Sequence, residues 1–242
     1  MDYSIIVYVF FGVLPSLTWL SYYLRKDAHP EPKAMILKIF LWGAVITLPV
    51  FFVQIGLTYL LSKVNLDPTV RTLAYWFLVI AMSEEFFKYL VIKMKVMDSP
   101  NLDEPLDIML YMVVAALGFA ALENILYLFA PIGQMSFNQL IDRTLVITLI
   151  RSIGATFLHT LCSAVIGYSL AISFCEVKNK KRILIVGVIL AALLHGLYDF
   201  SIMELNGYAK VAIPAIVILT LAFLVFSGFE KLKKMKGVCK IR

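Results

Sequence analysis

The chain contains seven long apolar runs, and this feature restricts its fold more than any other. About 20 consecutive apolar residues are enough for a helix to cross a bilayer. Backbone groups must satisfy one another inside lipid, and apolar runs without polar alternation indicate helices and not barrel strands. We therefore predict an all-α bundle of membrane-spanning helices, with spans at residues 3–24, 34–61, 70–93, 106–130, 144–174, 183–204 and 209–229.

Composition places the chain among integral membrane proteins. Hydrophobic residues make up 61% of the 242 residues, charged residues make up only 16%, and the mean hydropathy is +0.88. The spans use nearly the whole length, which leaves no stretch long enough for an independent soluble domain. We expect one membrane-embedded domain over residues 1–242 in the cell membrane, with a basic cytoplasmic tail at 230–242.

Lysine and arginine residues are distributed unevenly between the two sides of the predicted bundle. Sixteen of them lie near the connections after the first, third and fifth spans and in the tail, whereas four lie on the opposite side. Because positively charged loops stay in the cytoplasm, we expect the N-terminus outside and the C-terminus inside. The net charge is +6, but the basic residues flank apolar spans, so the expected partners are anionic lipid headgroups and not nucleic acid.

Ionisable side chains interrupt several of the apolar runs. A carboxylate at membrane depth costs about 3 kcal/mol or more unless it is received by water or by a partner, so such a residue indicates a functional site. At about 1.5 Å per residue along a helix, Glu84 and His195 both lie within the middle third of the bilayer. The polar residues inside the spans are Glu84, Glu85, Lys88, Glu123, Asn124, Arg151, His159, His195 and Asp199.

Spacing suggests how some of these groups support one another. Glu84 and Lys88 are four residues apart, as are His195 and Asp199, and residues at this spacing share a helix face. Lys88 can keep a carboxylate ionised, and Asp199 can fix the tautomer of His195 by accepting from a ring nitrogen. We expect Arg151 to be a counter-charge to a carboxylate. We expect Glu123 and Asn124 to join helices or to support the site.

This set of residues is suited to hydrolysis of a peptide bond. A carboxylate base and two imidazoles can activate a water and stabilise the oxyanion that forms. Alternatively, His159, His195 and one of the two glutamates could bind zinc with an open position, with Glu85 as the candidate ligand and the other glutamate as the base. The same residues would also suit a proton-coupled transporter, although no inverted repeat is evident. A non-catalytic scaffold is the third alternative.

Four motifs follow one another within residues 75–203. They are Glu84-Glu85-Phe86-Phe87-Lys88, then Gly118 to Asn124 with Tyr127, then Arg151 and His159 ahead of Gly167-Tyr168, and then His195 to Asp199. In this order they resemble the PrsW family, which belongs to a superfamily with the CAAX prenyl endopeptidases and the scaffold subunit of gamma-secretase. Lys88 and the Glu-Asn pair are more similar to PrsW than to the prenyl endopeptidases.

The resemblance implies a polytopic intramembrane protease that makes the first cut in a single-pass anti-sigma factor during stress signalling. Carried over by motif, Glu84 and Glu85 are the catalytic acidic pair, and Glu123, His159 and His195 complete the site. Position 199 often carries Asn in relatives, so the charged aspartate departs from the family pattern. The family is described as metal-dependent by analogy, whereas relatives also support a metal-free glutamate mechanism, which we favour.

Overall fold

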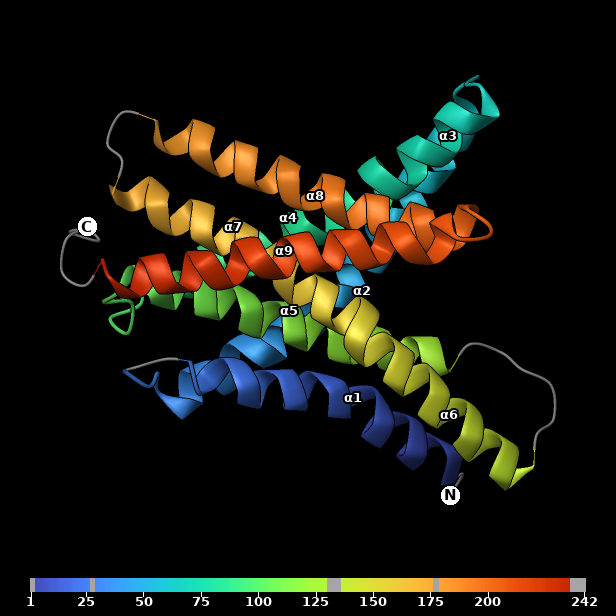
Figure 1. The fold of residues 1–242 in the computed structure, drawn as a ribbon, viewed down its shortest axis with the longest axis horizontal. Helices are drawn as coiled ribbons and strands as arrows, with labels where there is room; N and C mark the ends of the chain where they lie inside the picture. The colour runs from blue at the N-terminus through green and yellow to red at the C-terminus, as the bar shows by residue number, and fades with distance from the viewer. Residues whose placement is uncertain (1–2, 27–28, 130–135, 176–178, 236–242) are drawn as a thin grey trace.

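The computed structural model describes residues 3–26, 29–129, 136–175 and 179–235 (Figure 1). The helices in chain order are α1 (Tyr3–Leu24), α2 (Lys33–Lys63), α3 (Pro68–Ala74), η1 (Tyr75–Ala81), α4 (Met82–Lys95), α5 (Pro105–Leu128), α6 (Phe137–Arg151), η2 (Ser152–Thr156), α7 (Phe157–Cys175), α8 (Lys180–Glu204) and α9 (Ala209–Lys233). Within these described ranges there is no strand, which confirms the predicted all-α fold.

Six helical segments of the described chain are long and apolar enough to cross a membrane. One of them joins α6, η2 and α7 over Phe137–Phe174, and it begins earlier than the predicted start at residue 144. The remaining predicted span, at 70–93, lies in the continuous helical run α3–η1–α4, which carries two glutamates and a lysine among its apolar residues. The chain is therefore a multi-pass membrane protein, and about seven spans agrees with its helices.

Local sequence signals explain where several helices begin. At the start of α3, the Asp67 side chain accepts a hydrogen bond from the Thr69 N–H at 2.9 Å, and Pro68 occupies the first helical position, where no donor is needed. At the start of α6, Ser136 and Gln139 cap each other's backbone N–H groups. These caps satisfy donors that would otherwise be unpaired next to the membrane.

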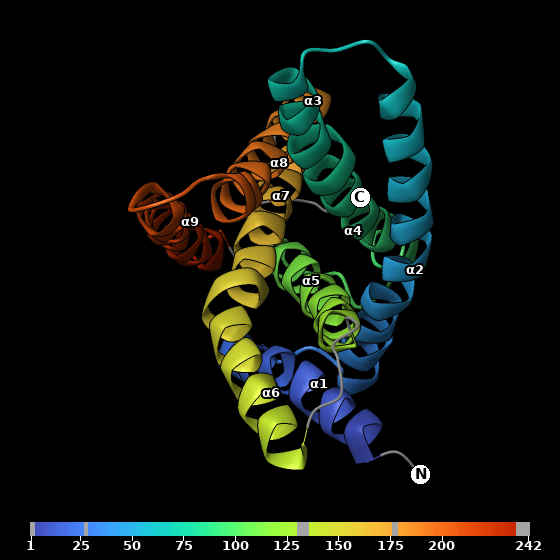
Figure 2. The same ribbon diagram turned by 90° about the vertical axis from the view of Figure 1, so that its right-hand side faces the viewer.

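Helix α5 occupies the centre of the bundle. Seen along the helices, it is surrounded by α1, α2, α4, α6 and α7, and α9 lies on the outside (Figure 2). In its apolar stretch, 94% of the residues are buried within the protein, whereas in the other candidate spans the share of buried residues is 17% to 44%. Because α5 is enclosed on nearly all sides, its polar side chains Asp107 and Asn124 are buried within the protein, whereas the Glu123 side chain is 31% exposed near the end of the helix.

Two helical runs contain π-helical segments, which the sequence did not predict. Segment η1 comes directly before the helix that carries the acidic pair, and η2 comes directly before the helix that carries His159. The Ser152 carbonyl of η2 accepts a hydrogen bond from Trp19 Nε1 at 2.8 Å, so α1 satisfies a group in the irregular turn. Segments of this kind are frequent at functional sites.

Some predictions fall on residues outside the described part of the chain. The last residue of the span predicted at 106–130 and the end of the basic tail, 236–242, belong to this group. In the described part, the basic helix ends and connections of the predicted cytoplasmic side gather at one end of the bundle, at the left of Figure 1. Which end faces the cytoplasm remains a prediction from charge.

Candidate active site

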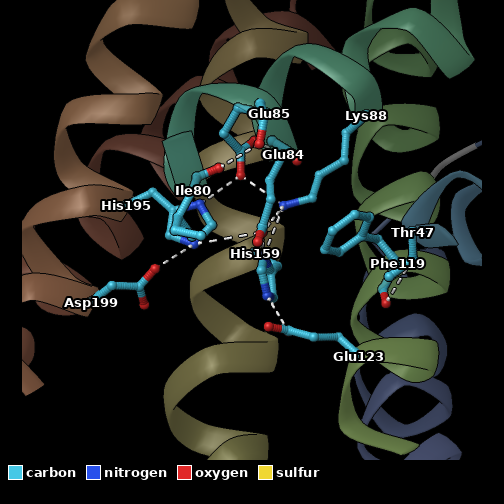
Figure 3. Close-up of polar contacts among 12 residues, drawn as sticks. Thr47, Ile80, Glu84, Glu85, Lys88, Phe119, Glu123, His159, His195 and Asp199 are labelled. Atoms are coloured by element: carbon cyan, nitrogen blue, oxygen red, sulfur yellow. Dashed lines mark hydrogen bonds and ion pairs between the residues drawn. The ribbon is translucent and has the colours of Figure 1, made fainter. Parts of the chain in front are cut away.

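The polar residues predicted from the sequence meet inside the bundle (Figure 3). Glu84, Glu85 and Lys88 project from α4, His159 from α7 and His195 from α8, and none of the five is more than 5% exposed. Helix α5 brings its glutamate to the same volume from the opposite side. Four helices thus supply one enclosed polar cluster.

The two adjacent glutamates have different surroundings. Both oxygens of Glu85 are occupied: Oε1 accepts from Lys88 Nζ at 2.8 Å and lies 2.9 Å from His195 Nδ1, and Oε2 accepts from Ser163 Oγ at 3.0 Å. A carboxylate held by three partners has little freedom to act as a base. Glu85 therefore serves best as an anchor for the lysine and the histidine beside it.

Glu84 is only partly engaged. Its Oε1 accepts a hydrogen bond from Gln54 Nε2 of α2 at 3.2 Å. Its Oε2 is buried and has no hydrogen-bond partner among the described residues. This oxygen lies 3.8 Å from His159 Nδ1 and 3.9 Å from His195 Nε2. A buried carboxylate oxygen without a partner is costly, so this atom points to a group that the site is built to receive.

Lys88 is fully buried and has partners on several sides. Its Nζ lies 2.8 Å from Glu85 Oε1, 2.8 Å from His159 Nδ1 and 3.5 Å from Glu84 Oε2. It also lies 4.4 Å from the centre of the Phe119 ring. An ammonium group shielded from water needs such charge and dipole contacts. The predicted pairing with Glu84 is present, but the closer contact is with Glu85.

The contacts of His159 define its tautomer. Nε2 lies 2.8 Å from Glu123 Oε2, and Nδ1 lies 2.8 Å from Lys88 Nζ. A carboxylate only accepts and an ammonium only donates, so the ring carries its proton on Nε2 and accepts at Nδ1. The neutral imidazole therefore turns a lone pair toward the Lys88 and Glu84 side of the cluster.

The predicted supporting residues surround this cluster. Arg151 Nη2 donates to Glu123 Oε2 at 2.8 Å, and Arg151 Nε donates to Asn124 Oδ1 at 2.6 Å. Asn124 in turn donates to Thr156 Oγ1 of η2 at 3.0 Å. On the other side, Asp199 Oδ2 lies 3.3 Å from His195 Nε2, as expected for residues four apart on α8.

Together these contacts form an unbroken row of ionisable side chains. Neighbours along the row are between 2.8 and 3.3 Å apart. The row contains, in spatial order, Asp199, His195, Glu85, Lys88, His159, Glu123 and Arg151. It links five helical segments, from α8 through α4, α7 and α5 to α6.

One group of side chains in the cluster is able to hold a metal ion. Glu84, His159 and His195 each offer a ligand atom, and these atoms lie within 4.8 Å of one another. The second nitrogen of each imidazole faces a carboxylate, an arrangement that orients metal-binding histidines. Our sequence-based ligand set contained Glu85, but the structure puts Glu84 in this grouping, because both oxygens of Glu85 are engaged elsewhere.

Gln54 was not anticipated from the sequence. It donates to Glu84 Oε1 and, at 3.3 Å, to Ser83 Oγ, so α2 contributes to the site as well. A signal was present, because Gln54 is the one carboxamide between Lys33 and Lys63. Polar residues in spans often join helices, but spacing alone does not reveal which helix such a residue faces.

Known proteins resemble this chain over most of its length. Residues 31–227 match the sequence model of a family described as PrsW family intramembrane metalloprotease. A protein named Protease PrsW from Oceanobacillus iheyensis is 30% identical over 208 residues, which is 86% of this chain and 88% of the relative. Proteins of the same name from Bacillus subtilis and Geobacillus kaustophilus are each 30% identical, over 94% and 95% of this chain and 94% and 92% of their own lengths. No solved structure gives a significant match.

Proposed function

Because this chain belongs to the PrsW family of intramembrane metalloproteases, we propose that Glu84 is the general base that activates water for hydrolysis of a peptide bond within the membrane. The observation that carries the proposal is the buried Oε2 oxygen of Glu84, which makes no hydrogen bond, lies 3.5 Å from Lys88 Nζ and faces a nitrogen of each of two histidines. The distances of 3.8 and 3.9 Å are too long for direct hydrogen bonds, so this oxygen can still accept a hydrogen bond from a water molecule beside it.

In the first step, Glu84 takes a proton from this water, and the water oxygen forms a bond to the carbonyl carbon of the scissile peptide. The carbonyl electrons move onto its oxygen, which becomes negative. His195, whose two ring nitrogens lie 2.9 and 3.3 Å from carboxylate oxygens, can donate to the developing oxyanion, and the Lys88 ammonium, which His159 Nδ1 holds in place, adds positive charge nearby. Preorganised groups of this kind are effective because the enclosed site excludes bulk water.

In the second step, the proton held by Glu84 passes to the leaving nitrogen. The carbon–nitrogen bond breaks, the carbonyl forms again, and the products are a carboxyl group and an amine. One water is consumed and Glu84 regains its starting state. Glu85 takes no proton in this scheme, because its oxygens hold Lys88, His195 and Ser163 throughout.

A divalent ion such as zinc would be held by Glu84, His159 and His195, and when bound it would polarise the carbonyl and activate the water. The unpartnered Glu84 oxygen and the carboxylates behind both imidazoles fit such an ion. However, Lys88 Nζ lies 2.8 Å from His159 Nδ1, and Asp199 Oδ2 lies 3.3 Å from His195 Nε2, so both contacts must be released before these nitrogens can serve as ligands. The scheme above therefore uses the chain's own residues, in line with a glutamate mechanism.

The substrate that we propose is an anti-sigma factor with one membrane-spanning segment. This class follows from the family resemblance, and the site is compatible with it because the cluster is enclosed within the span. Glu123 lies in the half of α5 that is distant from the basic connections. With the charge-based orientation, the cut falls on the extracytoplasmic side, while basic side chains at the other end contact anionic headgroups.

The proposal is tested by cleavage of such a substrate in vesicles containing the purified protein. Glu84→Gln removes the base while keeping the size of the side chain, and we expect a loss of at least about 100-fold in cleavage rate. His195→Ala should have an effect of similar size. Glu230→Gln is the matched control, because Glu230 is 66% exposed at its side chain and lies at the end of α9.

Full cleavage by both site variants would contradict the assignment of the base and of the imidazole. Each variant must first elute as a folded monodisperse species, so that a lost activity is not a lost fold. Metal analysis of the same purified proteins then tells whether a bound ion accompanies activity, provided that the chelated protein stays folded.

A further inference from the structure

A groove between α2 and α5 is lined in part by Glu84, the proposed base. It has a volume of about 290 Å³ and is lined by Thr47, Phe51, Gln54, Glu84 and Glu123, among others. Glu84 belongs both to this groove and to the buried cluster. The groove is therefore a route by which a bound molecule reaches the reacting atoms.

The packing of α2 against α5 determines where the groove begins. At Gly43 and Gly118 the two helices touch so closely that an added Cβ would collide with the Ala115 carbonyl or the Phe40 carbonyl. One turn later, Thr47 Oγ1 donates to its own helix, 3.3 Å from the Gly43 carbonyl oxygen, and lies within 3.5 Å of the Phe119 carbonyl oxygen. The groove occupies the space beyond this crossing.

Pro49 lies inside α2, in the sequence between Thr47 and Val50, which both line the groove. Proline has no N–H, so one backbone hydrogen bond of the helix is missing there, and helices bend most easily at such points. From Thr47 to Gln54, α2 rises about 10 Å, which equals about three residues of extended chain. The length of the groove is therefore that of a short unwound peptide.

The walls and the floor of the groove differ in chemistry. Val50, Phe51 and Leu126 make the walls apolar, while Gln54 and two glutamates lie at the inner end. Among the described residues that line the groove there is no lysine or arginine. An anionic lipid headgroup would face like charges, whereas the backbone N–H groups of an unwound peptide would supply donors to the carboxylates.

We propose that the α2–α5 groove binds an unwound segment of about three residues from the membrane span of the substrate, with its apolar side chains against Phe51 and Leu126. This inference rests on the proposed function, because it names the surface through which a protein substrate reaches Glu84. Unwinding is required, since a helix pairs its own backbone groups and is too wide for a space of this volume.

The chain supplies a matched pair of positions for a test. Phe51 and Phe52 are neighbours on α2, and their exposures are 51% and 69%, but only Phe51 lines the groove. On α5, Leu126 lines the groove, whereas Leu190 on α8 lines a different cavity, formed with α7 and α9. The four positions have similar access to lipid and differ in the cavity that they face.

A photoreactive benzophenone amino acid is placed at each of these four positions in the Glu84→Gln protein, which is reconstituted with a single-pass anti-sigma factor. We expect adducts with the substrate span from positions 51 and 126, and none or at least tenfold less from positions 52 and 190. Adducts only from 52 or 190, or equal adducts from all four, would overturn the proposal.

Crosslinking reports binding and not hydrolysis, so the two proposals fail in different ways. Cleavage by the wild-type protein without adducts from 51 and 126 contradicts the groove and leaves the protease mechanism standing. Adducts at these positions without any cleavage contradict the mechanism and leave the binding surface standing. As a second readout, Phe51→Ala should raise KM several-fold with little change in kcat, whereas Phe52→Ala should change neither.

Discussion

Glu84 and Glu85 are adjacent on α4, yet their side chains have different contacts. Successive residues on a helix point about 100° apart, so Glu84 and Glu85 approach Lys88 and His195 from different directions, and Glu85 makes the closer contacts. Glu85 turns toward Lys88, His195 and Ser163, and Glu84 turns toward the open side near α2. The sequence predicted that the pair was functional, but the assignment of roles required the positions of α2, α7 and α8.

This difference predicts separate effects on stability. Glu85→Ala leaves the fully buried Lys88 without its nearest carboxylate, so we expect the free energy of unfolding to fall by about 3 kcal/mol or more. Glu84→Ala removes one hydrogen bond from Gln54 and should cost about 1 kcal/mol. Unfolding in mixed micelles measures both values, and equal losses would mean that the two side chains share the structural role.

At the scale of the helix, the sequence predicted most elements but not their irregular turns. Long apolar runs placed the spans well, because this signal is local. The π-helical segments η1 and η2 depend on partners distant in the sequence. A Cβ on Gly196 of α8 would lie only 2.8 Å from Phe77 Cδ1 in η1, and Trp19 of α1 bonds to a carbonyl in η2. No local sequence pattern predicts such contacts.

The contact at Gly196 leads to a prediction for the element. Gly196→Ala should push η1 away from α8 and shift the acidic pair relative to His195, with a loss of about 10- to 100-fold in kcat. Gly56→Ala is the matched control, because an added Cβ at Gly56 meets nothing within 4 Å. Cleavage rates of the two variants provide the measurement. Unchanged cleavage in Gly196→Ala would show that the close packing is not needed for catalysis.

At the scale of the whole molecule, the sequence could not reveal which helices are neighbours. In lipid, an apolar helix face suits an acyl chain as well as another helix, so hydrophobicity does not mark the interior. The central position of α5 and the contribution of Gln54 from α2 are consequences of packing that only the structure provides. The ionisable residues inside the apolar runs nevertheless predicted the location of the site, since each of them contacts a partner inside the bundle.

The charge distribution predicts how the molecule is inserted. Asn65, between α2 and α3, should face the outside, and Asn179, before α8, should face the cytoplasm. In a chain whose three native cysteines are replaced by serine, a membrane-impermeant maleimide should label Asn65→Cys in intact cells. It should label Asn179→Cys only after lysis. The reverse pattern would invert the topology and place the cut on the cytoplasmic side.

The continuous row from Asp199 to Arg151 has a consequence for any titration of this protein. Each of the five inner members contacts two neighbours and each end member contacts one, so no inflection in an activity profile can be credited to one residue alone. A substitution of Asp199 or Arg151, at the ends of the row, should change the pH dependence of cleavage. The effects of two substitutions within the row on the cleavage rate should deviate from additivity. Seven side chains on five helical segments are thus electrostatically coupled, and each must be studied together with its neighbours.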